Sequence, residues 1–249
     1  DFEPGFYPWS AEYVLSESTY HHGEDTIAVF NSKELYQYIK NRGYSYDKEL
    51  FFKPYLNPKL KECLLNRNIY IKRDKVIIFY GRPVDSRNAF GLIYSALMEW
   101  SKSYRNAKEW KIYSLGDKFN DIKLENNVIH FLGKLSLEDY ANIMFSAYVG
   151  ICLMVSPHPS YPPLEMSTFG VKTIVNRFEE KDLSSFNSNI ISLLDYTPHS
   201  IANTLANVCN QYAADSAPII WNRDYLDNSD LKKIISELEE LLKYYNYEK

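Results

Sequence analysis

The sequence predicts an α/β protein with a doubly wound parallel sheet. From residue 75 onward six short apolar runs alternate with helical patterns, and buried parallel strands have this composition. Glycine directly follows three of these runs, as is common where a strand ends in a turn. Because helices separate the strands, we expect both faces of the sheet to be covered.

The elements follow one another in a regular order. The predicted strands are residues 75–80, 110–115, 128–132, 149–155, 171–175 and 190–194. Helices are predicted to start at Asp85 or Ser86, at Ser136, at the double proline Pro162-Pro163 and at Thr197, each by a capping residue or a proline in the first turn. Apolar residues at helical spacing support the first of them: Ala89, Ile93, Leu97 and Trp100.

The chain divides into three predicted parts. Residues 75–228 should form one complete doubly wound domain. Residues 1–74 contain one short strand (26–30) and one helix start (32–40), too little for a core, so we interpret them as the C-terminal part of an incomplete N-terminal domain with a linker. Residues 229–249 predict an amphipathic helix that packs back on the domains, with this apolar stripe: Leu231, Ile234, Leu238, Leu241 and Tyr245.

Bulk composition excludes several classes of function. A net charge of −4 gives no electrostatic reason to expect nucleic acid. Three cysteines without a short spacing form neither a disulfide framework nor a zinc site, which indicates a reducing cytoplasm. No apolar run reaches the roughly 20 residues of a membrane span. His21-His22 beside Glu24-Asp25 has no third ligand at a suitable spacing, so we expect no metal site.

The segment 156–170 lies between two predicted strands, at the carboxyl edge where open α/β sheets bind ligands. We predict that Glu165 lies in the first turn of the helix that follows. Two interpretations are equally good from spacing alone: a carboxylate that is stabilised by the helix dipole, or an acceptor for the vicinal hydroxyls of a ribose. His158 in the same loop either contacts a sugar or phosphate or is a surface histidine.

Two arginines follow the first strand of the domain. Arg82 lies just past the strand, and we predict Arg87 in the first turn of the next helix, where a bound anion such as a diphosphate would attract both. The alternative is that they are solvated or paired with Asp85 and Asp117. Lys134, after the third strand, either meets a phosphate or is solvated. The sequence has neither a Walker motif nor Gly-x-Gly-x-x-Gly, which argues against a P-loop enzyme or a dehydrogenase.

Three ordered motifs resemble those of the donor-binding domain of GT-B glycosyltransferases, especially retaining family-4 enzymes. They are Gly81-Arg82 with a cation five residues later at Arg87, the segment Phe131-Leu132-Gly133-Lys134-Leu135-Ser136, and Pro162-Pro163-Leu164-Glu165 in a helix that closes with Gly170. The resemblance covers roughly residues 26–245. It implies a GT-B fold in which 75–228 binds a nucleotide sugar and 1–74 belongs to the acceptor domain.

The resemblance also implies roles for individual residues. Arg82 and Arg87 match the cations that hold the donor diphosphate and stabilise it as the leaving group, and Glu165 matches the carboxylate that binds the ribose. The residues that frame the rest of the nucleotide sugar would be Gly81, Gly133, Lys134, Leu135, Ser160, Tyr161, Pro163 and Leu164. The family motif has a second glutamate where this chain has Pro157, and the neighbouring His158 would then stand near the sugar as a third catalytic residue.

The opening Asp1-Phe2-Glu3-Pro4 and the loop 156–165 are similar, more narrowly, to bacterial rhamnosyltransferases of surface polysaccharide synthesis. This resemblance implies a retaining transferase that takes L-rhamnose from dTDP-L-rhamnose, needs no cofactor or metal, and acts in the cytoplasm or at the inner face of the membrane on a glycan or lipid-linked glycan. The alternatives are a UDP- or GDP-sugar donor, or a non-catalytic module that binds nucleotide sugars.

Overall fold

A computed structural model describes residues 2, 5, 10, 11, 23–67, 70–212, 217, 218 and 222–247. The chain falls into two compact units. The larger consists of Asn57–Val155 and Pro159–Asn222, and the smaller of Asp1–Leu56, Ser156–His158 and Arg223–Lys249. The predicted boundary between residues 74 and 75 therefore falls inside the larger unit.

The larger unit is built on a seven-stranded sheet with the order β10-β9-β8-β4-β5-β7-β6. The six predicted strands are present and pair in parallel, which confirms the doubly wound α/β prediction. They are β4 (Val76–Gly81), β5 (Lys111–Gly116), β7 (Val128–Gly133), β8 (Val149–Cys152), β9 (Lys172–Asn176) and β10 (Ile190–Leu193). The seventh, β6 (Ile122–Lys123), has no counterpart among the predicted elements and runs antiparallel to β7 at the edge.

The order of the strands fixes where a ligand can enter. From β4 the chain builds outward through β5 and β7 on one side, and then returns to add β8, β9 and β10 on the other. The switch point lies between β4 and β8, and sheets of this kind bind ligands outside the carboxyl ends of the strands at that point. The segments that follow β4 and β8 therefore border the expected crevice.

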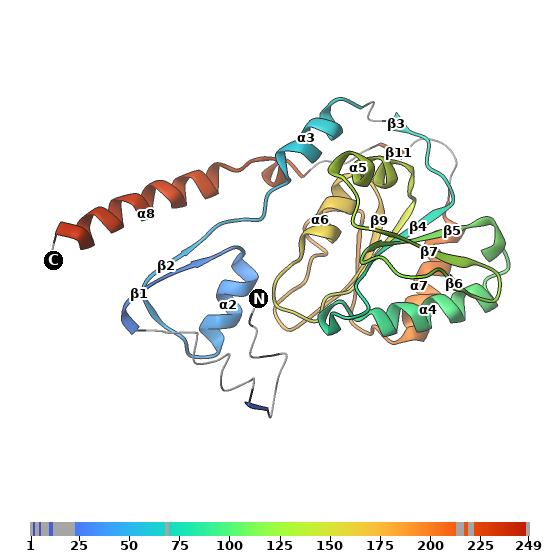
Figure 1. Ribbon diagram of the computed structural model, residues 1–249, viewed down its shortest axis with the longest axis horizontal. Helices are drawn as coiled ribbons and strands as arrows, with labels where there is room; N and C mark the ends of the chain where they lie inside the picture. The colour runs from blue at the N-terminus through green and yellow to red at the C-terminus, as the bar shows by residue number, and fades with distance from the viewer. Residues whose placement is uncertain are drawn as a thin grey trace. The chain divides into compact units, whose positions relative to one another are not determined.

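Helices cover both faces of the sheet (Figure 1). One face is covered by α4 (Phe90–Ser103) and α7 (Pro198–Asn210), and the other by α5 (Leu137–Ser146) and α6 (Tyr161–Thr168). Alternate residues of β4 explain the first layer, because Ile77 and Phe79 are fully buried in one core cluster with Trp100 of α4 and Leu205 of α7. The short helix α3 (Pro58–Leu65) packs against α5.

Two helices begin at different residues from those predicted. Ser86–Asn88 form a separate 3-10 turn that ends at Ala89, where φ is 49° and ψ is 39°, and α4 starts only at Phe90. A left-handed residue cannot continue a right-handed helix, so the prediction that Arg87 lies in the first turn of α4 was wrong. Helix α6 starts at Tyr161, before the double proline, and its first turn contains no acidic residue. Glu165 therefore lies in the second turn, and its predicted place was also wrong.

Glycine is required at two strand ends. A Cβ atom at Gly81 would collide with the Ser114 hydroxyl of β5, so only glycine lets these two strands end side by side. Gly133 has a φ of 74°, and a Cβ there would lie 3.2 Å from the Cβ of Lys118. Both glycines keep side chains away from the carboxyl edge of the sheet.

The smaller unit contains β1 (Gly23–Phe30), α2 (Lys33–Asn41), β2 (Tyr46–Phe51), a 3-10 turn (Asp224–Leu226) and α8 (Ser229–Tyr247). Strand β2 pairs in parallel with β1, so the prediction of one short strand in residues 1–74 missed a strand. Helix α8 lies where the C-terminal helix was predicted, and Ile234 of its apolar stripe is buried.

The remaining short elements are an antiparallel pair, β3 (Tyr70–Ile71) with β11 (Ala217–Pro218), and a 3-10 turn at Ala107–Glu109. In the described part of the chain, no group of histidine, cysteine or acidic side chains is arranged to hold a metal ion. No described helix is both long enough and apolar enough to cross a membrane. His21-His22 and most of the segment from Asp1 to Pro8 lie outside the described residues.

Candidate functional site at the carboxyl edge of the sheet

The loop after β4 brings the two predicted arginines onto one carboxylate. Arg82 Nη1 donates to Asp85 Oδ2 at 2.8 Å, and Arg87 Nε donates to Asp85 Oδ1 at 2.9 Å. Asp85 Oδ1 also accepts from the backbone N–H of Arg87 at 3.2 Å, which fixes the 3-10 turn. The side chain of Asp85 is only 11% exposed, whereas the two guanidinium groups that it binds remain partly exposed.

A second carboxylate completes the balance of charge in this loop. Asp117, just past β5, lies with Oδ1 3.6 Å from Nε of Arg82. Two arginines thus lie beside two aspartates, and the pairing that the sequence left open as an alternative is observed. Pairing does not use up the donors of Arg82, because a guanidinium carries five N–H groups. The loop can therefore accept an anion without losing the contacts that orient it.

Glu165 has a different environment from the arginines. It is partly buried on α6, and burial raises the pKa of its carboxyl to about 7, while a hydrogen bond from Tyr140 of α5 acts in the opposite direction. Among the described residues it forms no ion pair. The favourable effect of a helix dipole on an anion is confined to the first turn, so the dipole does not account for a carboxylate in the second turn. Of the two interpretations that the sequence left open, the position of Glu165 favours the one in which its carboxylate binds a ligand.

The start of α6 is unusual as a helix terminus. Ser160, the N-cap residue, has a φ of 67° and a ψ of 148°, and its side chain makes no capping hydrogen bond. Such backbone costs about 1–3 kcal/mol in a non-glycine residue and is enriched at ligand sites. Pro162 and Pro163 then remove two of the N–H groups that a helix start normally offers to an anion. This terminus supplies little positive potential, so an anion at this edge would depend on side chains for positive charge.

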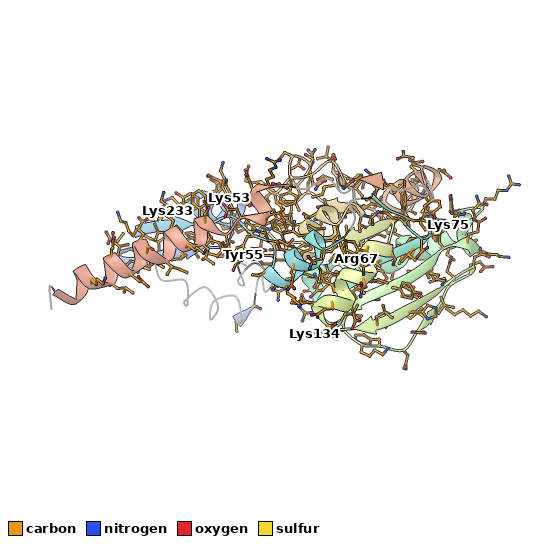
Figure 2. The ribbon with its side chains drawn as sticks, turned by 90° about the horizontal axis from the view of Figure 1, so that it is seen from above. Lys53, Tyr55, Arg67, Lys75, Lys134 and Lys233 are labelled. Carbon is orange, nitrogen blue, oxygen red and sulfur yellow. The ribbon has the colours of Figure 1, made fainter. Side chains whose placement is uncertain are left out.

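The third predicted segment follows β7. Gly133 ends the strand, and Ser136 caps α5 as predicted, its Oγ accepting from the N–H of Asp139 at 3.1 Å. Lys134 is exposed and forms no ion pair with any residue that the structure describes. Figure 2 shows Lys134 well separated from Lys75, as expected for residues at opposite ends of parallel strands. Lys134 thus lies at the same edge as Arg82.

The structure brings together some of the predicted site residues and not others. Arg82 and Arg87 share one carboxylate, and the segments containing Glu165 and Gly133 begin at the same edge of the sheet. Ser160, Tyr161, Pro163 and Leu164 all lie at the start of α6. His158 groups with the smaller unit instead, where it is buried and its N–H donates to Ser156 Oγ at 3.1 Å.

Sequence reasoning missed the function of two residues. Asp85 was considered only as a cap or a partner of the arginines, and not as the group that orients both. Tyr140 was not considered as a site residue, and its side chain in α5 lowers the pKa of Glu165. A signal for Tyr140 was its place one helical turn past Ser136, on a helix that packs beside α6.

Solved glycosyltransferases of the GT-B fold share the doubly wound sheet of this chain. The solved structure of sucrose-phosphate synthase from Thermosynechococcus elongatus aligns over 100% of this chain and 66% of its own, with a TM-score of 0.56 and 15% identity. WaaG, a glycosyltransferase involved in lipopolysaccharide biosynthesis, aligns over 83% of this chain and 60% of its own, with a TM-score of 0.54 and 14% identity. These likenesses show the fold alone.

The sequence assigns the family. Residues 75–206, more than half of the chain, match the family described as "WsaF, C-terminal domain", and residues 1–33 match "WsaF, N-terminal domain". The chain belongs to the WsaF family. It is also 29% identical over 177 residues to the O-antigen biosynthesis protein RfbC of Myxococcus xanthus, an alignment that spans 71% of this chain and 13% of that relative.

Proposed function

We propose that this chain carries the donor site of a retaining glycosyltransferase that builds a bacterial surface glycan, with L-rhamnose transferred from dTDP-L-rhamnose. The fold, the WsaF family and the similarity to a protein named for O-antigen biosynthesis support the general class. The acceptor would be a growing glycan or a lipid-linked glycan, reached in the cytoplasm or at the inner face of the membrane. The donor sugar and base rest on the motif resemblance.

The observation that carries the proposal is the pair of arginines held by Asp85 at the switch point. When a glycosyl group leaves its nucleotide, negative charge develops on the diphosphate. Groups that are already oriented toward that charge lower the barrier because they need little reorganisation. Asp85 fixes Arg82 and Arg87 before any ligand arrives. Since two prolines deplete the N–H groups of α6, the arginines, with Lys134, would provide most of this stabilisation.

Glu165 would bind the nucleoside. A carboxylate accepts two hydrogen bonds from vicinal hydroxyls, and a hydrogen bond to a charged group contributes about 1.5–3 kcal/mol. Because the pKa of Glu165 is raised to about 7 by burial, the ionised form that accepts both bonds becomes dominant only above neutral pH. Binding of the donor should therefore depend on pH in the physiological range.

Retention would follow from attack by the acceptor on the face that the diphosphate leaves. Double displacement needs a carboxylate free to attack the anomeric carbon. Asp85 and Asp117 are engaged by Arg82, and Glu165 is proposed for the nucleoside, so none is assigned to that role. The acceptor hydroxyl would transfer its proton to the departing phosphate.

A second donor class is favoured by one observation. The two oxygens of Glu165 suit the 2′- and 3′-hydroxyls of a ribose, whereas the deoxyribose of dTDP offers only a 3′-hydroxyl. A UDP- or GDP-sugar would use this carboxylate more fully. The same fold without catalysis, as a module that binds nucleotide sugars, is the remaining alternative.

Calorimetric titration of the full chain with dTDP, UDP and GDP, followed by assays of donor hydrolysis, tests these options. We expect one nucleotide to bind at least about ten-fold more tightly than the others, which corresponds to about 1.4 kcal/mol. Preference for dTDP supports the rhamnose donor, and preference for UDP or GDP supports the second class. Binding without hydrolysis or transfer points to the module, and no binding by any nucleotide contradicts the proposal.

A further inference from the structure

A buried arginine lies on the far side of the larger unit from the loop of Arg82. Arg73 precedes β4 and is 2% exposed. Its Nη1 donates to the carbonyl oxygens of Met144 at 3.0 Å and Ala147 at 2.6 Å, and its Nη2 donates to that of Phe169. Burial lowers the pKa of Arg73 to about 10, so the side chain still carries its charge at neutral pH. No described carboxylate pairs with it.

The three carbonyls belong to the C-terminal ends of two helices. Met144 and Ala147 lie in the last turn and the C-cap of α5, and Phe169 is the C-cap of α6. Helix C-termini carry partial negative charge and unsatisfied carbonyls, so one guanidinium neutralises both ends at once. The rings of Phe145 and Phe169 pack at the same junction, with centroids 4.9 Å apart. Arg73 thus joins α5 to α6.

The joined helices also carry the two side chains of the proposed nucleoside site. Glu165 lies one turn before the Arg73-bound end of α6, since the N–H of Phe169 donates to the Glu165 carbonyl at 2.9 Å. Tyr140, whose side chain lowers the pKa of the Glu165 carboxyl, lies one turn before Met144 in α5. Arg73 therefore contacts the two helices that carry Tyr140 and Glu165.

Helix α6 depends on this junction more than most helices would. It has eight residues, and its first turn has neither a side-chain cap nor the two N–H groups that Pro162 and Pro163 lack. Its C-terminal end is the better-anchored one. A rotation of α6 about its axis, or a slide along α5, would separate Glu165 from Tyr140, and Arg73 opposes both movements because it contacts the two helices together.

We propose that Arg73 is a positioning residue for Glu165: it fixes α6 against α5 so that the carboxylate faces the hydroxyls of a bound nucleoside. The inference rests on the proposed function, in which Glu165 binds the nucleoside. Lysine cannot replace arginine in this role, because an ammonium group is a compact charge, whereas the planar guanidinium reaches three carbonyls in fixed directions.

The test compares Arg73→Lys with wild type and with Arg67→Lys as a matched control. Arg67 (Figure 2) donates to Asn142 at 2.8 Å and lies over the ring of Phe145 at 5.2 Å, so it contacts α5 without reaching α6. The full chain of each is titrated with UDP, with 2′,3′-dideoxyuridine diphosphate and with inorganic pyrophosphate. The quantity of interest is the ratio of the two nucleotide Kd values, which isolates the contribution of the hydroxyls.

We expect wild type and Arg67→Lys to bind UDP about ten-fold more tightly than the dideoxy nucleotide, as for bonds to a charged acceptor. In Arg73→Lys the ratio should fall to about two-fold or less, with pyrophosphate binding unchanged. A mere loss of stability would lower Tm without changing the ratio. Retention of the ten-fold ratio in Arg73→Lys would overturn the proposal.

Two further variants keep the outcomes distinct. Glu165→Gln alone should abolish the ten-fold difference between the two nucleotide Kd values. If the difference persists in that variant, the assignment of Glu165 fails and the inference about Arg73 fails with it. If wild type binds the two nucleotides equally tightly, both are contradicted. Should Arg73→Lys not fold, Phe169→Leu loosens the same junction through its ring contact with Phe145. A ratio that stays at ten-fold in that variant is contrary to the inference, and a reduced ratio supports it.

Discussion

Two regions at the carboxyl edge of one sheet handle charge in opposite ways. In the loop after β4, Arg82 and Arg87 are already paired with Asp85, and Asp117 after β5 supplies the second negative charge before any ligand is present. On α6, Glu165 is partly buried, has no described ion-pair partner and has a pKa raised to about 7. Ion pairs with Asp85 orient the two arginines, whereas the helix α6 orients Glu165.

This difference implies different sensitivities. The guanidinium groups are partly exposed and can add contacts to a phosphate while Asp85 still holds them. Glu165 must lose a proton before it accepts two hydrogen bonds, and the required protonation state depends on burial. Substitutions in the first region should therefore affect the chemical step, and those in the second should affect nucleoside binding and its pH dependence.

The largest effect is expected from Arg82→Ala. Removal of one oriented group that stabilises the leaving diphosphate should lower kcat by about 10²–10³-fold, and nucleoside diphosphate binding should weaken as well. Steady-state kinetics with the preferred donor measure this. Lys75→Ala is the matched control, because Lys75 lies at the other end of β4 and pairs with Glu109. An Arg82→Ala protein with normal turnover and normal binding would remove the arginine loop from the mechanism.

An intermediate effect is expected from pH and Glu165→Gln. If only the carboxylate form binds the nucleoside hydroxyls, a pKa of about 7 makes affinity rise about ten-fold between pH 6 and pH 8. Glu165→Gln should abolish this rise, whereas Glu138→Gln on the exposed side of α5 should keep it. Titration calorimetry across this range gives the slope, and the same slope in wild type and Glu165→Gln would exclude Glu165 as its source.

The stability of the ligand-free protein should follow the opposite trend. The folded state raises the pKa of Glu165 from an ordinary 4.5, so it binds the proton more tightly than the unfolded chain does. Stability from this group is present at low pH and is lost as pH rises from about 4.5 to about 7. Thermal unfolding of wild type and Glu165→Gln should therefore diverge over that window.

The smallest effect is expected from Tyr140→Phe. The Tyr140 hydroxyl lowers the pKa of Glu165, so its loss should move the midpoint of the pH dependence upward. Affinity at pH 7 should fall about two-fold, in proportion to the carboxylate fraction. Tyr113→Phe, on β5, is the control. A downward shift would show that Tyr140 shields Glu165 from water more than it bonds to it.

Much of the fold could be predicted from the sequence, because buried parallel strands are apolar throughout and helices alternate with them. Strand β2 could not, since its sequence, YDKELF, shows neither an apolar run nor clean alternation, and its burial is equally irregular. The two-residue strand β6 is too short for any periodic signal. Ala89 illustrates another limit: nothing about an alanine signals a left-handed backbone, which the surrounding structure imposes.

The sequence predicted which residues form the candidate site better than it predicted where they lie in the helices. The motifs identified Arg82, Arg87 and Glu165, but helix α6 starts one residue before the double proline, and that shift moved Glu165 out of the first turn. The role of Arg73 had no local signal, because its three partners are backbone carbonyls distant in sequence. Contacts of that kind depend on the folded arrangement of α5 and α6 and not on any residue pattern near Arg73.

The antiparallel strand β6 has a consequence for the behaviour of the protein at high concentration. A sheet that ended at β7 would present six residues of unpaired backbone to a neighbouring molecule, and long flat edges of that kind promote aggregation. Strand β6 covers that edge over only two residues, reverses its direction and presents Lys123 to solvent. We therefore expect β6 to reduce self-association at this edge. Deletion of residues 122–123 should lower solubility more than it lowers Tm.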